Sequence, residues 1–168
     1  MPAGNQLFQL TIATPDGQFI ARYSEKGLAE LHFPKVGSAR CVDRTPQRGV
    51  PTQIRDWHRT TESALKNILA GTEPKDFPPL HAVGTEFQKS VWREMRKIPF
   101  GETRSYGEVA QGIGKPKAVR AVGGACGANP IPVLVPCHRV LAAHGEIGGF
   151  GGGLDWKRKL LAGEGIVL

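Results

Sequence analysis

The residues with the clearest chemistry in this chain are Cys137 and His138, which are adjacent and follow an apolar run bounded by Pro132 and Pro136. A thiolate is the strongest ordinary nucleophile among protein side chains, and it needs a neighbour that lowers its pKa or takes its proton. Because adjacent side chains diverge in helices and strands, we expect a bridging water to carry the proton to His138. The pair therefore predicts nucleophilic chemistry at sulfur.

An imidazole that accepts a proton needs an acid to fix its tautomer. The sequence after His138 offers three candidates for this acid, Glu146, Asp155 and Glu164, and their spacing does not choose among them. A purely structural interpretation also stays open at this point, because a buried cysteine is common as a small hydrophobic residue and its histidine neighbour can be incidental.

A helix predicted over residues 117–127 precedes this pair and consists largely of alanine and glycine, with Arg120 among them. Each glycine inside a helix costs about 1 kcal/mol relative to alanine, so their number requires a reason. One reason is close packing against another helix of the same domain. The other is a smooth face that lets DNA approach, with Arg120 projecting to fill the space left by an extruded base.

Two further helices are predicted before this one, over residues 85–98 and 105–113. Each begins with a capping-box pattern, Thr85 with Gln88 and Ser105 with Glu108. Gly114 and Pro116 separate the second of them from the glycine-rich helix. This is typical of a helix-turn-helix that binds DNA, although helical hairpins in ordinary bundles have similar patterns.

The first half of the chain predicts a small sheet that carries one helix, and no residue of it has a pattern typical of catalysis. We expect strands at 8–13, 18–23 and 28–33, a loop at 34–51, a helix at 54–68 and a proline-containing linker at 73–84. Downstream we expect a buried strand at 133–135 and a helical turn at 140–143. The fold class is therefore α/β (α+β), with an N-terminal sheet-plus-helix domain (1–84) and a helical, winged-helix-like domain (85–168).

Composition favours an anionic partner and a reducing compartment. The 168 residues carry a net charge of +7, and 12 basic against 7 acidic residues follow Thr85, where Cys137 also lies. The three cysteines form no CxxC pair, so we expect neither a disulfide framework nor a metal. Neither a signal peptide nor a membrane-spanning run is evident, so we expect a cytoplasmic protein.

The motifs resemble those of the O6-alkylguanine-DNA alkyltransferases, and the similarity extends from Thr85 to Glu164 with no evident gap. It is carried by four sequence segments: Pro136-Cys137-His138-Arg139, Arg120-Ala121-Val122-Gly123-Gly124-Ala125, Asn129-Pro130 and Gly151-Gly152-Gly153-Leu154. The resemblance implies DNA repair by direct reversal. The protein would transfer a methyl or alkyl group irreversibly from O6-alkylguanine in DNA to its own cysteine, once per molecule.

The resemblance also implies roles for individual residues. Cys137 is the expected alkyl acceptor, His138 its base through a water, Glu164 the acid that orients the imidazole, and Tyr106 the donor to the flipped base. The residues expected to contact DNA or the base are Arg120 (filling the gap), Ala121, Gly124, Asn129 (the hinge), Val140, Phe150 and Gly151. The family binds double-stranded DNA in the minor groove. We expect a monomer with no cofactor, no membrane association and no obligate protein partner.

Three departures from the family pattern and two alternative functions remain. The N-terminal cysteines that hold a structural zinc in some relatives are absent, so we expect no structural zinc. Phe150 stands where many relatives have a tyrosine, and Gly127 where some have a basic residue. One alternative is a non-catalytic protein that binds alkylated DNA, which Cys137 argues against. The other is a Cys-His hydrolase or thiol transferase, in which the histidine usually comes from a distant segment. The sequence leaves open whether O4-alkylthymine is also a substrate.

Overall fold

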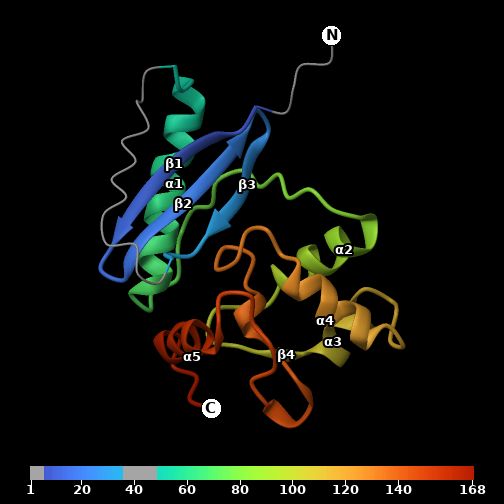
Figure 1. The fold of residues 1–168 in the computed structure, drawn as a ribbon. Coiled ribbons are helices and arrows are strands. Elements are labelled where there is room, and N and C mark those ends of the chain that lie inside the picture. Colours follow the sequence, from blue (N-terminus) through green and yellow to red (C-terminus); the bar gives the residue numbers. More distant parts are fainter. Residues whose placement is uncertain (1–5, 36–48) are drawn as a thin grey trace.

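A computed structural model describes residues 6–35 and 49–168, and in these residues it has a mixed α/β fold, which confirms the predicted class. Figure 1 shows the arrangement. In chain order the elements are β1 (Phe8–Thr14), β2 (Gly17–Ser24), β3 (Gly27–His32), α1 (Thr52–Leu69), α2 (Glu86–Met95), β4 (Arg104–Ser105), α3 (Tyr106–Gly112), α4 (Val119–Gly127), β5 (Val140–Leu141) and α5 (Leu154–Gly163). Short 3-10 turns, Cys137–Arg139 and Ala143–Gly145, flank β5. Most of the loop predicted over 34–51 lies outside the described residues.

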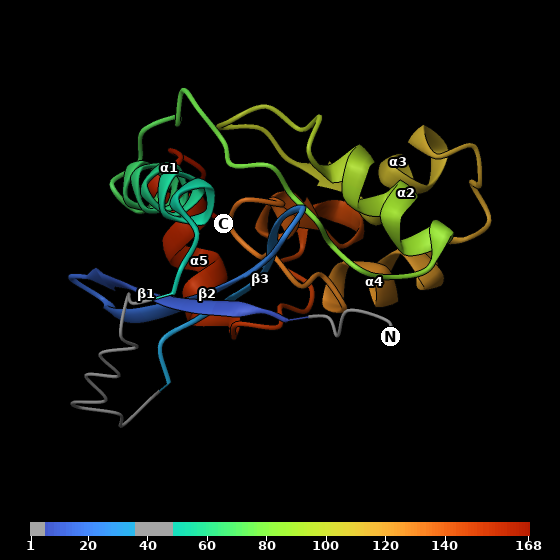
Figure 2. The same cartoon turned by 90° about the horizontal axis from the view of Figure 1, so that it is seen from above.

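The first three strands form an antiparallel sheet in the order β1-β2-β3. The predicted turn between β1 and β2 is present, and Gly17 in it has φ +119°, a conformation that residues with a Cβ rarely adopt. Alternate residues of β2, Phe19, Ala21 and Tyr23, are buried, as expected for a strand with one covered face. Helix α1 lies against this sheet (Figures 1 and 2).

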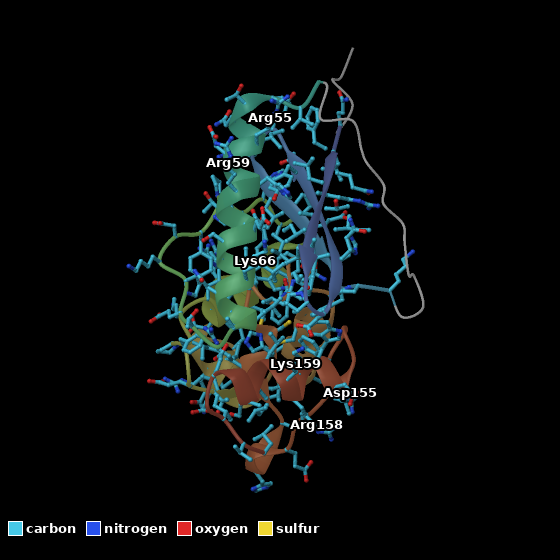
Figure 3. All side chains as sticks on the ribbon, turned by 90° about the vertical axis from the view of Figure 1, so that its left-hand side faces the viewer. Arg55, Arg59, Lys66, Asp155, Arg158 and Lys159 are labelled. Atoms are coloured by element: carbon cyan, nitrogen blue, oxygen red, sulfur yellow. The ribbon has the colours of Figure 1, made fainter. Side chains whose placement is uncertain are left out.

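Helix α1 is amphipathic, so its apolar side is buried and its charged side faces away from the sheet. Its buried residues are Ile54, Thr61, Ala64, Leu65 and Ile68. Arg59 and Lys66 project from the opposite side in Figure 3. Each has an acidic partner one turn away, Asp56 at 3.2 Å and Glu62 at 2.6 Å. Local pairs thus offset much of the positive charge on this side of the helix.

Helices α2 and α3 begin at the capping boxes that the sequence predicted. The Thr85 hydroxyl accepts from the Gln88 backbone N–H at 3.2 Å, and the Gln88 side chain accepts from the Thr85 N–H at 2.9 Å. Ser105 and Glu108 make the same pair of bonds at 3.1 and 2.7 Å. Each box satisfies two of the backbone N–H groups that a helix start leaves without partners.

Helices α3 and α4 pack against each other and against α2, and a tight turn with Gly114 at φ +72° joins them. This is the predicted helix-turn-helix arrangement. Helix α4 begins at Val119, two residues after the predicted start, because Pro116 and Lys117 belong to the turn.

The predicted strand at 133–135 is wrong, because these residues form a tight turn. Pro132 and Val135 bridge across it, and Val133 at its tip has φ +74°. A β-branched residue in this region is strained, and such strain persists only where the surroundings impose it. The flanking prolines lack the N–H groups that a strand ladder requires. The prediction of burial holds, since Val133 is 1% exposed.

The predicted helical turn at 140–143 is also wrong at its start, where Val140 and Leu141 form β5. This strand runs parallel to β4, with Val140 opposite Arg104 and Leu141 opposite Ser105. A local sequence pattern cannot predict that β5 pairs with β4, because the two strands are far apart in the sequence. It fixes the segment after Cys137 to the start of the helix-turn-helix.

Helix α5, which no sequence pattern predicted, packs against α1 and against the 3-10 turn at Cys137 (Figure 1). Its buried residues are Lys157, Leu160 and Leu161. The division into domains 1–84 and 85–168 stays a prediction. Within residues 6–35 and 49–168, none of the helices combines the length and the apolar character needed to span a bilayer.

Candidate active site

Cys137 is the first residue of a 3-10 turn that follows directly on the strained turn at Val133. The Val135 N–H donates to the Ile131 carbonyl at 2.9 Å, and the Cys137 N–H donates to the Val135 carbonyl at 2.8 Å. These bonds hold the backbone on the N-terminal side of the thiol. Cys137 itself is only 7% exposed, so the thiol lies in a buried position.

His138 forms part of a buried network centred on the carboxylate of Glu164. The His138 Nε2 lies 2.8 Å from Glu164 Oε1, and both side chains are fully buried. Arg139 donates to both oxygens of the same carboxylate, at 2.8 Å from Nε and 3.0 Å from its terminal nitrogen. The Gly101 N–H adds a fourth donor at 3.1 Å. Of the three candidate acids, Glu146 and Asp155 are exposed, so the carboxylate beside His138 is that of Glu164.

This network fixes the charge of Glu164 and the tautomer of His138. Burial disfavours the charged carboxylate, but hydrogen bonds from His138 and Arg139 outweigh it and lower the pKa of Glu164 to about 2. A carboxylate accepts hydrogen bonds but donates none. The Nε2 that faces Glu164 must therefore be the donor, so the proton of a neutral His138 is on Nε2. Its Nδ1 is then an acceptor, and it is the buried side-chain nitrogen without a protein partner among the described residues. Burial also lowers the pKa of His138, which keeps the ring neutral.

The Cys137 thiol is not a strong acid in this environment. Burial raises its pKa, while a hydrogen bond with the Asn129 side chain and the positive charge of Lys157 act in the opposite direction. Lys157 is fully buried, and its ammonium group donates to the Val140 carbonyl at 2.7 Å and the Gly149 carbonyl at 3.3 Å. A base that takes the proton is therefore needed for the sulfur to become a nucleophile.

A cavity of about 200 Å³ lies beside the thiol, between the helix-turn-helix and the glycine-rich loop that precedes α5. It is lined by Tyr106, Gly123, Cys126, Gly127, Cys137, Gly149, Phe150 and Gly151. Burial raises the pKa of the Tyr106 phenol, so the hydroxyl keeps its proton and remains a donor. The structure thus brings together four predicted site residues: Tyr106, Cys137, Phe150 and Gly151.

Asn129 connects the end of α4 to the segment that carries the thiol. Its amide donates to the Val135 carbonyl at 2.9 Å, and its carbonyl oxygen accepts from the Ile131 N–H at 3.0 Å. These contacts tie the position of the helix to that of the active-site backbone. The hinge role of Asn129 stays a prediction.

The exposed face of α4 is nearly free of side-chain bulk. Arg120, Ala121 and Gly124 are all exposed on it. Cβ atoms built at Gly123, Gly124 and Gly127 would meet no atom within 4 Å, so close packing inside the protein does not explain these glycines. That finding favours the second interpretation of the sequence, a smooth face for an external partner.

Val140 is bonded to Cys137 through its backbone but is not part of the cavity wall. Its N–H donates to the Cys137 carbonyl, and its own carbonyl accepts from Lys157. Lys157 and Arg139 are functional residues to which no sequence pattern assigned a role. A signal for Lys157 exists, since it precedes Leu160 and Leu161 by three and four residues and so shares the buried face of α5.

Cys126 also lines the cavity, and burial raises the pKa of its thiol to about 12. Its Sγ contacts the sulfur of Met95 at 3.5 Å. Cys41 lies outside the described residues. Within the described ranges, no three His, Cys, Asp or Glu side chains are close enough to hold a metal ion, and the expectation of no metal stays a prediction.

Comparisons with known proteins agree with this geometry. Residues 86–166 match the family model described as the DNA binding domain of 6-O-methylguanine DNA methyltransferase. A protein of Methanosarcina acetivorans named methylated-DNA–protein-cysteine methyltransferase is 42% identical over 160 residues, which cover 95% of this chain and 99% of the relative. A protein of the same name from Mycolicibacterium paratuberculosis is 62% identical over 133 residues, 78% of this chain and 81% of the relative.

Solved structures give the same result. The crystal structure of Mycobacterium tuberculosis O6-methylguanine methyltransferase has a TM-score of 0.69 with 38% identity, over 95% of this chain and 93% of that one. A structure of the M. tuberculosis protein in complex with DNA has a TM-score of 0.68 at 38% identity, with coverage of 92% and 90%.

Proposed function

This chain belongs to the family of methylated-DNA–protein-cysteine methyltransferases, enzymes that repair DNA by alkyl transfer, and on that premise we propose that Cys137 is its alkyl acceptor. The substrate is duplex DNA that carries O6-alkylguanine. The alkyl group moves to the sulfur once per molecule. The observation that carries this proposal is the position of Cys137 in the wall of a cavity, next to a histidine whose buried Nδ1 has no hydrogen-bond partner in the described part of the chain.

The thiol proton passes to Nδ1 of His138 through a bridging water. Glu164 holds the other ring proton on Nε2, so Nδ1 presents its lone pair. The imidazolium that forms lies against the negative charge of Glu164, which offsets its formation. Arg139 positions the carboxylate by donating to both of its oxygens.

The transfer is a displacement at carbon. The sulfur forms a bond to the alkyl carbon while the bond from that carbon to O6 breaks, and the electron pair moves into the guanine ring. The Tyr106 hydroxyl donates the proton that neutralises the leaving base, at N3. Backbone groups near Cys137 and Val140 read the edge of the guanine, and Phe150 and Gly151 cover it. The thioether product has no acidic S–H, so the protein is not regenerated.

Helix α4 reads the DNA from the minor groove in this proposal. The exposed alanine and glycine face suits a narrow groove, and a base inside a duplex must be flipped out for its O6 to reach the cavity. Arg120 is exposed on this face, and no ion pair to it occurs among the described residues. Its guanidinium takes the place of the extruded guanine.

Intact-protein mass spectrometry tests the proposal. The protein is mixed with excess duplex DNA that carries one O6-methylguanine, and the mass is compared with that of a Cys137→Ala variant. One added methyl group, mapped to the Cys137 peptide and absent from the variant, is the expected result. Tight binding without a mass change would instead indicate a lesion-binding protein, and repeated turnover a hydrolase. A parallel duplex with O4-methylthymine decides whether that base is a second substrate.

The remaining parts of the proposal concern organisation. We propose a monomer that needs no obligate protein partner. We also propose that it acts in the cytoplasm, at the nucleoid if the cell is bacterial, and that it consists of domains 1–84 and 85–168. Sedimentation of the free and DNA-bound protein tests the first point. Limited proteolysis tests the last, because cleavage at residues 73–84 should leave a stable C-terminal fragment.

A further inference from the structure

The end of strand β3 reaches the segment that carries Cys137. The Leu31 N–H donates to the Pro130 carbonyl at 2.8 Å, and β3 lies beside the C-terminal segments in both Figure 1 and Figure 2. A groove of about 450 Å³ lies between them. Phe33 and Pro34 belong to its N-terminal wall, and Cys137 belongs to the opposite wall. The N-terminal sheet therefore borders the space beside the thiol.

Phe33, directly after β3, contacts the glycine-rich loop. Its ring centroid lies 5.5 Å from that of Phe19, 5.0 Å from that of Trp156 and 5.7 Å from that of Phe150. Aromatic pairs at such distances are mutually attractive. The three partners come from β2, α5 and the loop, so the Phe33 ring joins three separate parts of the chain. Phe150 is also part of the cavity beside Cys137.

The loop has little of its own to hold it. Five of its six residues from 148 to 153 are glycine, and Phe150 supplies its one side chain. Glycine has more backbone freedom than any other residue, so a segment of this composition takes a defined shape only through external contacts. Besides the bond from Lys157 to the Gly149 carbonyl, the contact with Phe33 is such a restraint.

Gly152 lies directly against the Phe33 ring. A Cβ built at Gly152 would be 2.5 Å from the nearest ring carbon, well inside van der Waals contact. Contacts with Phe19, Trp156 and Phe150 restrict how far this partly buried ring can move aside. The fit between the sheet and the loop is therefore close at this point.

We infer that Phe33 is a positioning residue for alkyl transfer. By holding Gly152 and Phe150, it fixes the loop that forms one wall of the cavity, and so the placement of the alkylated base relative to the Cys137 sulfur. Phe33 touches neither the base nor the thiol in this role. The inference rests on the proposed function and extends it to a part of the chain whose sequence shows no catalytic pattern.

Single-turnover kinetics separate positioning from folding, because each molecule accepts one methyl group. The amplitude of methyl uptake reports the fraction of correctly folded protein, and the rate constant at saturating DNA reports the geometry of the site. We expect Phe33→Ala to lower the rate constant by on the order of 10- to 100-fold, as small misplacements of reacting groups do. The amplitude and the DNA concentration for half-maximal rate should stay as in the unaltered protein.

Two variants provide controls. Phe33→Leu keeps most of the apolar volume and should return the rate constant to within a few-fold of the original. Phe8→Ala removes another partly buried phenylalanine of the same sheet, one for which no ring contact occurs among the described residues. It should leave the rate constant unchanged. An equal slowing in Phe8→Ala would show that general loosening of the sheet is responsible and would overturn the inference.

The contact with Gly152 gives a second test, in which Phe33→Ala is expected to raise the rate constant of another variant, an outcome that misfolding caused by Phe33→Ala cannot produce. Gly152→Ala should slow transfer, because the added Cβ meets the Phe33 ring. The double variant with Phe33→Ala should transfer faster than Gly152→Ala alone, because the smaller residue at position 33 removes this clash. Two losses that multiply, or a Phe33→Ala protein with the original rate constant and amplitude, would each refute the role of Phe33. If the unaltered protein takes up no methyl group, the proposed function itself fails, which is a separate outcome.

Discussion

Replacing Glu164 by glutamine removes a charge that the structure holds in place with several donors. The pKa of this carboxyl falls from 4.5 to about 2 on folding, and each pKa unit corresponds to about 1.4 kcal/mol, so its charged form contributes about 3 kcal/mol to stability. The amide would also leave the Arg139 guanidinium, 8% exposed, without a counter-charge. Removing one partner of a buried ion pair costs about 3–5 kcal/mol, which agrees in size.

The pH dependence of this loss has a definite sign. Folding lowers the pKa of Glu164, so its contribution is complete above pH 4.5 and disappears as the pH falls toward 2. The stability difference between the unaltered protein and Glu164→Gln should therefore be constant near neutral pH. It should shrink between pH 4.5 and 2, where the unaltered protein also loses the charge.

Urea unfolding at a series of pH values measures this difference, with Glu146→Gln as the matched control. Glu146 is an exposed carboxylate in the same part of the chain, and its replacement should change stability by less than about 0.5 kcal/mol. Methyl transfer by Glu164→Gln should also slow by about 100-fold, because the imidazole loses its tautomer restraint. Equal unfolding midpoints for Glu164→Gln and the unaltered protein at neutral pH would refute this account of the network.

Three other substitutions or treatments have defined outcomes. Asn129→Ala should lower the free energy of unfolding by about 2–3 kcal/mol in urea, because it leaves the Val135 carbonyl and the Ile131 N–H without their partner; an unchanged midpoint would contradict the hinge role. Arg120→Ala should slow methyl transfer on duplex DNA more than on single strands, because only a duplex leaves a gap to fill when the base is flipped out. Equal slowing on both substrates would argue against the gap-filling role. Cys126 should remain unmodified by iodoacetamide at about pH 8, since its pKa is raised to about 12, and peptide mass mapping after the reaction checks this.

The parts of this structure that the sequence predicted correctly depend on short-range rules. The capping boxes at Thr85 and Ser105 each depend on two residues three positions apart. Helices α2 and α3 begin at the positions that these patterns predict. The hairpin between β1 and β2 follows from its turn and its alternation. Cys137 and His138 were candidates because they are neighbours. Glu164 is different, since spacing left three acids open and only the family resemblance selected it.

The features that sequence reasoning missed depend on contacts between distant segments. An apolar run such as 133–135 is compatible with a strand, and it is the neighbouring prolines and the packing around Val133 that impose a turn. Strand β5 exists because β4 lies beside it. The close contact between the Phe33 ring and Gly152 joins the two halves of the chain, and no local pattern in either segment predicts it.

The open space around the glycines of α4 has a consequence for how this protein can evolve. An alanine at Gly123 or Gly124 would meet nothing in the free protein, and in a helix it would be more stable than glycine by up to about 1 kcal/mol. Selection for heat resistance alone would therefore favour alanine at these positions. If α4 binds DNA as proposed, selection for repair would retain glycine, because a methyl group there would meet the bound DNA. A population evolved for thermostability without DNA damage should lose these glycines first, and its ability to repair DNA with them.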